Sequence, residues 1–368
     1  MAETNISVKP VYDYVCELPL YKELDYEGQA YLYEHEFKNL QGGCSATVKS
    51  IDGETIVARN LDFNISNKSA YIIKTEVPGF YKTVGVSYVP WFGPDWKEAV
   101  EEGVSEEFAK IIPFFSCDIL NEKGFYIQAD MRTEEHHDGV PRYKNNGLNP
   151  GGERVSSIAF LRYAAERCAT VDDVLELLKE IDFYSLAAPG IAWGFAYIVA
   201  DATGNYGVLE IAGDKVYFNK YQPVHTNMYV TPELAKDQLY RTGLGRYYTL
   251  MANHFKAKDE QAMQDLIDLV RYSRQYEDPE TCPFDWRHEY YDEKDGVVYE
   301  KVIDPANQAQ LIASQQAECA RQKKMTRQEK QDLNSIWETT LSVRTNVMKR
   351  TMRIRFYEDE NRVVTLTI

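Results

Sequence analysis

Cys44 is the residue of this chain best suited to covalent chemistry. It follows Gln41-Gly42-Gly43, and the two consecutive glycines leave the backbone sterically open to attack. A cut after Gly43 would place Cys44 at a new N-terminus, where its thiol is a nucleophile and its α-amine, with an ordinary pKa of about 8, is the base. The simpler alternative is a small apolar residue, buried at the start of a strand.

Arg59 and Asp62 supply complementary groups for such a nucleophile. Runs of alternating residues flank the step Asp52-Gly53, which predicts a β-hairpin that returns residues 59–62 to Cys44. A guanidinium near the sulfur stabilises a thiolate, and a carboxylate can orient a terminal amine. A salt bridge at the end of a strand is the alternative for this pair. Taken with Cys44, the pair predicts a thiol site.

The elements that must position these residues alternate between strands and helices. A second hairpin is predicted around the turn at residues 121–124. The remaining predicted elements are helices at 26–37, 153–168, 171–181, 242–254 and 260–276, a polar helical region at 305–333, and strands at 194–200, 206–211, 216–218, 224–229, 337–344, 351–356 and 363–368. This order predicts an α+β architecture of stacked antiparallel sheets covered by helices.

Several short motifs, in a fixed order between residues 43 and 356, resemble those of the choloylglycine hydrolase or linear-amide C–N hydrolase family. This family includes bile salt hydrolases, penicillin V acylases and acid ceramidase-like enzymes. The motifs are Gly43-Cys44, Ala58-Arg59-Asn60-Leu61-Asp62-Phe63, Leu120-Asn121-Glu122-Lys123-Gly124, Val224-His225-Thr226-Asn227, Thr242-Gly243-Leu244-Gly245-Arg246 and Ser335-Ile336-Trp337.

The resemblance implies a four-layer αββα sandwich of the N-terminal-nucleophile (Ntn) hydrolases. It implies that Cys44 is both nucleophile and base, with Arg59 and Asp62 beside it. Asn227 would donate its side-chain amide to the oxyanion, and Arg246 would complete the polar network. A backbone N–H near Met131 would be the second oxyanion donor. Without the resemblance, Asn227 is interpreted as a turn residue at a strand end and Arg246 as a solvated helix residue.

The position of the cysteine departs from one branch of this family. Bile salt hydrolases begin with the cysteine directly after the initiator methionine, whereas 43 residues precede Cys44 here. We therefore expect residues 1–43 to be a prosegment that is removed or displaced on maturation, and residues 44–368 to be a single catalytic domain. In an uncut chain, residues 1–43 should cover the Cys44 pocket.

The resulting functional prediction is an amidohydrolase that acts on linear N-acyl amides through a thioester on Cys44. Conjugated bile salts, penicillin V-like amides and N-acyl amino acids or amines are the substrate classes left open. An acyltransferase of the same family and a catalytically silent amide-binding member are the alternatives. No metal or organic cofactor is expected. The run of residues 134–138, Glu-Glu-His-His-Asp, is a poor metal site because adjacent histidines point in different directions.

The amino-acid composition limits the kinds of molecule to which this protein could bind. The net charge of −16 argues against binding to nucleic acid or to an anionic membrane face, and no stretch approaches the roughly 20 apolar residues of a membrane-spanning helix. We expect a small-molecule substrate, with a homo-oligomer left open. The first residues show no secretory signal, which predicts a cytoplasmic protein, or a secreted one if a signal peptide has already been removed.

Overall fold

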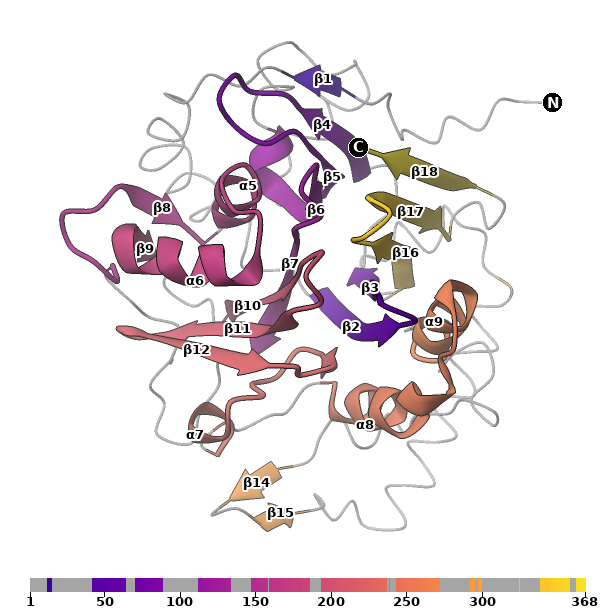
Figure 1. Cartoon of the computed structure of the whole chain (residues 1–368). Helices are drawn as coiled ribbons and strands as arrows, with labels where there is room; N and C mark the ends of the chain where they lie inside the picture. The colour runs from indigo at the N-terminus through magenta and orange to yellow at the C-terminus, as the bar shows by residue number, and fades with distance from the viewer. Residues whose placement is uncertain are drawn as a thin grey trace.

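Two stacked β-sheets dominate the computed structural model of the chain (Figure 1). The predicted segments at 26–37, 134–138 and 305–333 lie outside the described residues. The structure describes residues 12–14, 42–63, 70–88, 112–133, 147–157, 159–185, 193–236, 238, 243–271, 292–294, 297–299, 324, 338–357 and 362–368.

The larger sheet has eight strands in the order β1-β4-β5-β6-β7-β10-β11-β12. Its neighbours pair antiparallel, except that β1 pairs parallel with β4 at one edge. The strands are β1 Tyr12–Tyr14, β4 Ala70–Thr75, β5 Thr83–Tyr88, β6 Ser116–Asn121, β7 Tyr126–Thr133, β10 Trp193–Ala200, β11 Tyr206–Ala212 and β12 Lys215–Lys220. The predicted second hairpin is confirmed as β6 and β7.

The smaller sheet has six strands in the order β13-β2-β3-β16-β17-β18, all antiparallel. They are β2 Gly42–Ile51, β3 Glu54–Phe63, β13 Val224–His225, β16 Glu338–Asn346, β17 Thr351–Phe356 and β18 Val363–Thr367. The chain's last three predicted strands thus lie beside the β2–β3 hairpin. Two short pairs stand apart from both large sheets: β8 Arg154–Ser156 with β9 Asp182–Tyr184, and β14 Asp292–Lys294 with β15 Val297–Tyr299.

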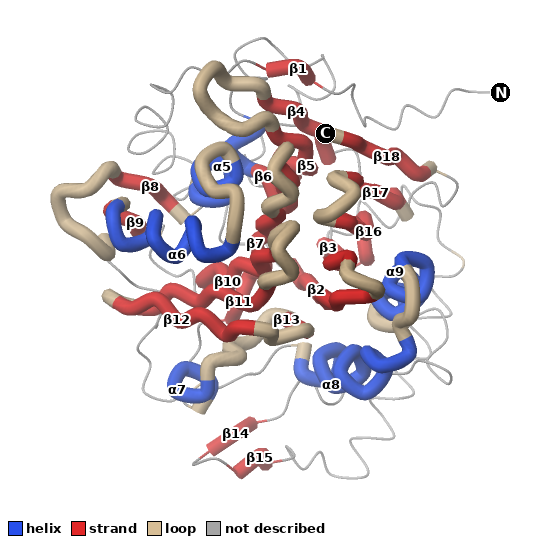
Figure 2. The backbone as a smooth tube through the Cα atoms, in the orientation of Figure 1, coloured by secondary structure: helices blue, strands red, loops and turns tan. Residues whose placement is uncertain are grey.

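Helices cover the outer face of each sheet (Figure 2). On one side α5 packs on β6 and β7, with α6 beside it; on the other, α8 and α9 pack on β2, β3, β13 and β16. The helices are α5 Phe160–Ala165, α6 Val171–Glu180, α7 Pro232–Ala235, α8 Leu244–Asn253 and α9 Glu260–Asp268, with the 3-10 turns η5 Ile112–Phe115 and η6 His254–Lys256. The predicted α+β sandwich, with its αββα layers, is confirmed.

The β2–β3 hairpin closes through Asp52 and Gly53, which both have positive φ, at 50° and 83°. Such a pair fits a two-residue turn whose twist matches that of the strands. In the register, Cys44 lies opposite Leu61 and Ala46 lies opposite Arg59. The predicted hairpin is confirmed, although β2 begins two residues before Cys44.

Alternation along β3 decides which layer each side chain faces. Val57 and Leu61 join the apolar cluster between the sheets, whereas Ile56 and Ala58 join the cluster beneath α8 and α9. Burial of each larger aliphatic side chain contributes roughly 1.5–3 kcal/mol, which locks this orientation. Arg59 therefore faces the larger sheet.

The predicted helix at 260–276 ends early, at Asp268, and two further predicted elements are wrong in part. The predicted helix at 153–168 begins as strand β8, because residues 154–156 pair in parallel with β9, and only Phe160–Ala165 is helical. The predicted strand at 224–229 ends at His225. Beyond it, the backbone N–H groups of Tyr229 and Val230 donate to side-chain oxygens rather than to a neighbouring strand. Contacts distant in sequence override the local pattern in both places.

Within the described residues, no helix is long and apolar enough to cross a membrane. The same part of the chain holds no group of three or more His, Cys, Asp or Glu side chains suited to a metal ion. Of the predicted prosegment before Gly42, only β1 is described, at the edge of the larger sheet.

Candidate active site

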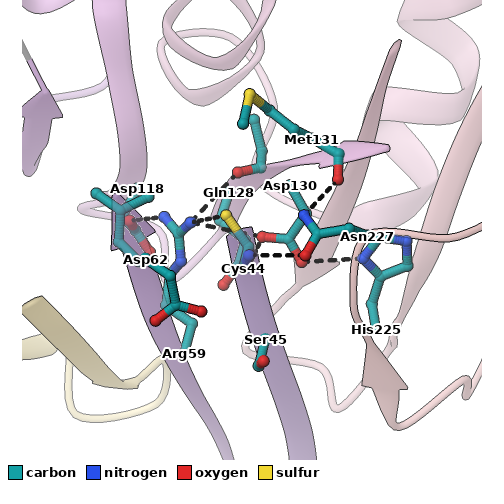
Figure 3. Close-up of polar contacts among 12 residues, drawn as sticks. Cys44, Ser45, Arg59, Asp62, Asp118, Gln128, Asp130, Met131, His225 and Asn227 are labelled. Carbon is teal, nitrogen blue, oxygen red and sulfur yellow. Dashed lines mark hydrogen bonds and ion pairs between the residues drawn. The ribbon is translucent and has the colours of Figure 1, made fainter. Parts of the chain in front are cut away.

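Cys44 lies where the two sheets face each other, on the third residue of β2, and its side chain is 1% exposed (Figure 3). Arg59, on the same face of the hairpin, donates from Nη2 to the Cys44 Sγ at 3.0 Å. Burial raises the pKa of the Cys44 thiol well above its usual range; Arg59 opposes this shift, and the carboxylates of Asp130 and Asp62 add to it. Arg59 is thus the group that favours a thiolate here.

Asp62, on β3, lies opposite Gly43 of β2. By the alternation along β3, its side chain faces the layer of α8 and α9. Its Oδ1 accepts a hydrogen bond of 2.6 Å from the Thr339 hydroxyl, and its Oδ2 is 3.5 Å from Nη1 of Arg246. The structure therefore separates the two predicted partners of Cys44: Arg59 contacts the thiol, and Asp62 contacts Thr339 and Arg246.

Asn227 and Arg246 hold that backbone. The backbone N–H of Cys44 donates to Asn227 Oδ1 at 3.0 Å, and Arg246 donates to the same oxygen at 2.9 Å. Arg246 also donates to the Cys44 carbonyl at 2.7 Å and to the Ser45 hydroxyl at 2.8 Å. Arg246 is 1% exposed, so it is not the solvated helix residue of the alternative interpretation. Three of the other four predicted side chains, Arg59, Asn227 and Arg246, thus contact Cys44, and Asp62 joins them through Arg246.

Met131 lies in the site in a way that differs from the expectation. Its carbonyl oxygen accepts a hydrogen bond of 2.7 Å from Asn227 Nδ2. This contact fixes which side of the Asn227 amide presents its oxygen to Cys44. The role of the Met131 N–H as an oxyanion donor stays a prediction, as do the catalytic roles of the other residues.

Gly43, the predicted cleavage position, lies inside this cluster. A methyl group added at its Cα would come within 3.4 Å of Asp62 Oδ2 and 3.6 Å of Asn227 Oδ1. The peptide bond between Gly43 and Cys44 therefore lies beside the side chains of Asp62 and Asn227.

Behind Arg59 lies a set of buried polar side chains that the sequence analysis missed. Arg59 Nη1 donates to Asp118 Oδ2 at 2.6 Å, and Nη2 is 3.5 Å from Asp130 Oδ1. His225 Nδ1 is 2.9 Å from Asp130 Oδ2. A signal existed in β7, where Tyr126, Gln128, Asp130 and Arg132 place polar groups at every second position, alternating with Ile127, Ala129 and Met131.

The stacked sheets place a cysteine near the start of a strand of the smaller sheet, facing the larger sheet. The profile of one family, described as acyl-coenzyme A:6-aminopenicillanic acid acyl-transferase, matches residues 146–318. The match includes Asn227 and Arg246 but not Cys44, Arg59 or Asp62. A search of curated protein sequences finds no match.

The fold is shared with a solved structure. A variant of conjugated bile acid hydrolase from Clostridium perfringens matches with 14% identity and a TM-score of 0.50, over 88% of this chain and 92% of the other. Penicillin V acylase from Agrobacterium tumefaciens matches with 13% identity and a TM-score of 0.43, over 88% and 86%. The predicted resemblance to the choloylglycine hydrolase-like Ntn group is confirmed.

Proposed function

We propose that this protein is a cysteine amidohydrolase that acts on linear N-acyl amides after a cut between Gly43 and Cys44. The observation that supports it most is the convergence on one residue. Arg59 Nη2 lies 3.0 Å from the Cys44 sulfur, while Asn227 accepts from the Cys44 nitrogen at 3.0 Å. Once the chain is cut, that nitrogen is the α-amine, already held beside the thiol it must deprotonate.

The proposed reaction has two stages. The α-amine of Cys44 takes the thiol proton, and the thiolate attacks the amide carbonyl to give a tetrahedral oxyanion. An Nδ2 hydrogen of Asn227 and the Met131 N–H are the proposed donors to that oxyanion. The C–N bond then breaks, the leaving amine takes the proton from the α-ammonium, and a thioester remains. Water, deprotonated by the same amine, hydrolyses the thioester and restores the thiol.

The cut itself would use the same groups. In the proposed maturation, the Cys44 thiol attacks the Gly43 carbonyl, its nitrogen leaves as the α-amine, and water releases residues 1–43 from the thioester. Intact-mass measurement tests this step. We expect a species that begins at Cys44, absent from a Cys44→Ala variant; a wild-type chain that stays uncut and inactive would contradict the proposal.

The substrate class is tested by a screen on the mature form. Conjugated bile salts, phenoxyacetyl amides, aliphatic amides and N-acyl amino acids should be compared by release of the free amine. Hydrolysis of at least one class, lost in Cys44→Ala, is the expected result. Binding without turnover would favour the catalytically silent alternative.

Acyl transfer is the second candidate, and the match to an acyl-transferase family favours it. In that case an amine rather than water attacks the Cys44 thioester. Product analysis with and without an added acceptor amine separates the two, because only transfer yields a new amide at the expense of the free acid.

A further inference from the structure

A chain of buried polar groups connects the two carboxylates beside Arg59. The Tyr126 hydroxyl oxygen is 2.5 Å from Asp118 Oδ1 and 2.8 Å from Gln128 Oε1, and Gln128 Nε2 is 2.9 Å from Asp130 Oδ1. All four side chains are 0% exposed. Three hydrogen-bond contacts therefore run in series between two carboxyl groups.

The hydrogen atoms available to these three contacts between Asp118 and Asp130 can be counted. An ionised carboxylate only accepts hydrogen bonds. If Asp118 and Asp130 are both ionised, the Tyr126 hydroxyl supplies one hydrogen and the Gln128 amide supplies one, which makes two. Three contacts need three hydrogens. Rotation of the Gln128 amide by 180° moves the deficit from one contact to another but does not remove it. Two oxygens that face each other without a hydrogen are unfavourable in a buried site. One of the two carboxyl groups must therefore carry a proton.

The surroundings distinguish the two carboxyl groups. Asp130 Oδ1 accepts a hydrogen bond from Gln128 Nε2 and lies 3.5 Å from the Arg59 guanidinium, and its Oδ2 lies 2.9 Å from His225 Nδ1, which can donate to Oδ2 when Asp130 is ionised. Among the described residues, Asp118 has one donor besides the tyrosine, Arg59 Nη1 at 2.6 Å from Oδ2. More donors favour the ionised form. Burial also raises the pKa of Asp118, against the opposing effects of Arg59 and Tyr126.

We propose that Asp118 is a neutral carboxylic acid in the folded protein, whose Oδ1 proton is donated to the Tyr126 hydroxyl oxygen. Tyr126 then donates to Gln128 Oε1, and Gln128 donates to ionised Asp130, so that each contact has one hydrogen. Asp118 Oδ2 still accepts from Arg59. Asp118 is a positioning residue, because it acts through Arg59 and does not touch the thiol.

This arrangement has a consequence that rests on the proposed function. With Asp118 neutral, Arg59 faces a single buried carboxylate, Asp130, together with the Cys44 sulfur. An ionised Asp118 would add a second negative charge beside Arg59 and would oppose formation of the thiolate. The proton on Asp118 thus keeps the Arg59 charge available to Cys44.

Infrared spectroscopy of the full chain at neutral pH tests the proton directly. We expect a protonated-carboxyl stretch in the wild type that disappears in Asp118→Asn. The matched control is Asp201→Asn, which removes another buried aspartate whose oxygens accept several hydrogen bonds, and which should leave the band intact. A wild-type spectrum without the band, or a band that survives Asp118→Asn and disappears in Asp130→Asn, would overturn the proposal.

A second variant keeps the test decisive if Asp118→Asn does not fold. Tyr126→Phe removes the acceptor of the Asp118 proton, so the band should shift or vanish. An unchanged band in this variant would also overturn the proposal. Circular dichroism and thermal unfolding establish that each variant is folded before its spectrum is compared.

Activity measurements distinguish a neutral Asp118 from an Asp118 that acts as the charged partner of Arg59 in an ion pair. An asparagine at 118 can donate to Tyr126 and accept from Arg59, as the neutral acid does. Asp118→Ala should lower kcat/KM at least about 30-fold, and Asp118→Asn should restore most of that loss, to within about threefold of wild type. If the Asp118 charge were needed, asparagine would fail as alanine does. If the wild type hydrolyses no amide, the proposed function fails while the infrared result still decides the proton.

Discussion

Replacement of Asn227 best distinguishes a catalytic role, donation to the oxyanion, from a structural role, acceptance of hydrogen bonds from Cys44 and Arg246. Asn227→Asp keeps an acceptor for the Cys44 nitrogen and Arg246 but removes the Nδ2 hydrogens. On the mature form we expect kcat to fall about 10²- to 10³-fold, the usual effect of losing an oxyanion donor, with a smaller change in KM. Steady-state kinetics on any amide that the wild type hydrolyses provide the measurement.

A matched control exists for this variant. Asn121 is another fully buried asparagine, which holds the backbone of the β6–β7 turn and of the segment after α5. Asn121→Asp should lower stability but leave kcat close to wild type. A rise in KM with an unchanged kcat for Asn227→Asp would instead assign Asn227 to ground-state binding.

The Cys44 thiol should make stability depend on pH. Burial raises its pKa in the folded chain well above the value of about 8.5 expected when unfolded. A group of this kind contributes its full stability below the unfolded pKa, and that contribution is lost as the pH rises towards the folded pKa. The unfolding free energy of the uncut chain should therefore decline above about pH 8.5 more steeply than that of Cys44→Ser.

Urea unfolding between about pH 7 and pH 10 checks this, on material whose intact mass shows that residues 1–43 are still attached. The serine variant is a close steric match that does not titrate in this range. Parallel pH profiles for the two proteins would show that the Cys44 thiol is not desolvated as the structure has it.

At the scale of single residues, the sequence was sufficient to select a candidate site residue where that residue belongs to a recognisable motif. Cys44, Arg59, Asp62, Asn227 and Arg246 could all be selected in this way, and they meet in the structure. Asp118 and His225 could not be assigned, because their contacts with Arg59 and Asp130 join strands of different sheets. Only the three-dimensional stacking of the sheets brings those groups together.

At the scale of elements, the β2–β3 hairpin places Cys44 and Arg59 on one face, and its turn can be tested alone. Gly53 has φ of 83° with no atom within 4 Å of an added Cβ, so Gly53→Ala meets a conformational cost but no clash. We expect a loss of about 1 kcal/mol, and a smaller loss for Gly53→Asn, because asparagine tolerates this backbone region better.

Denaturant unfolding of the two variants measures that difference, and amide hydrolysis by the folded fraction should stay at the wild-type level. An activity loss larger than the stability loss would mean that the turn influences the site at the other end of the strands.

The hairpins were predictable because turn residues and alternation are local signals, and the helices at α6 and α8 followed from the periodicity of apolar residues. Strand β8 was not. It pairs with β9, which lies beyond α6 in the sequence, and Gly152 allows the close approach, since an added Cβ there would be 2.3 Å from the Glu180 carbonyl oxygen. A helical period cannot reveal a pairing of that kind.

At the scale of the whole molecule, the question is whether the fold needs residues 1–43. Within the described residues, this segment contributes β1 at the edge of the larger sheet and the first two positions of β2, Gly42 and Gly43, which pair with Phe63 and Asp62. The seven other strands of the larger sheet and the apolar cluster between the sheets come from residues after 43. A chain that begins at Cys44 should therefore fold without residues 1–43.

A chain that begins Met-Cys44, from which the initiator methionine is removed, tests this directly. We expect a folded protein, a small change in thermal midpoint and amide hydrolysis without any processing step. If instead the chain aggregates, and is rescued when residues 1–43 are supplied in trans, the segment is needed for folding. If it folds but stays inactive while the processed full chain hydrolyses amides, the cut at Gly43 does more than expose the amine, since both chains then share one N-terminus and one set of side chains around Cys44.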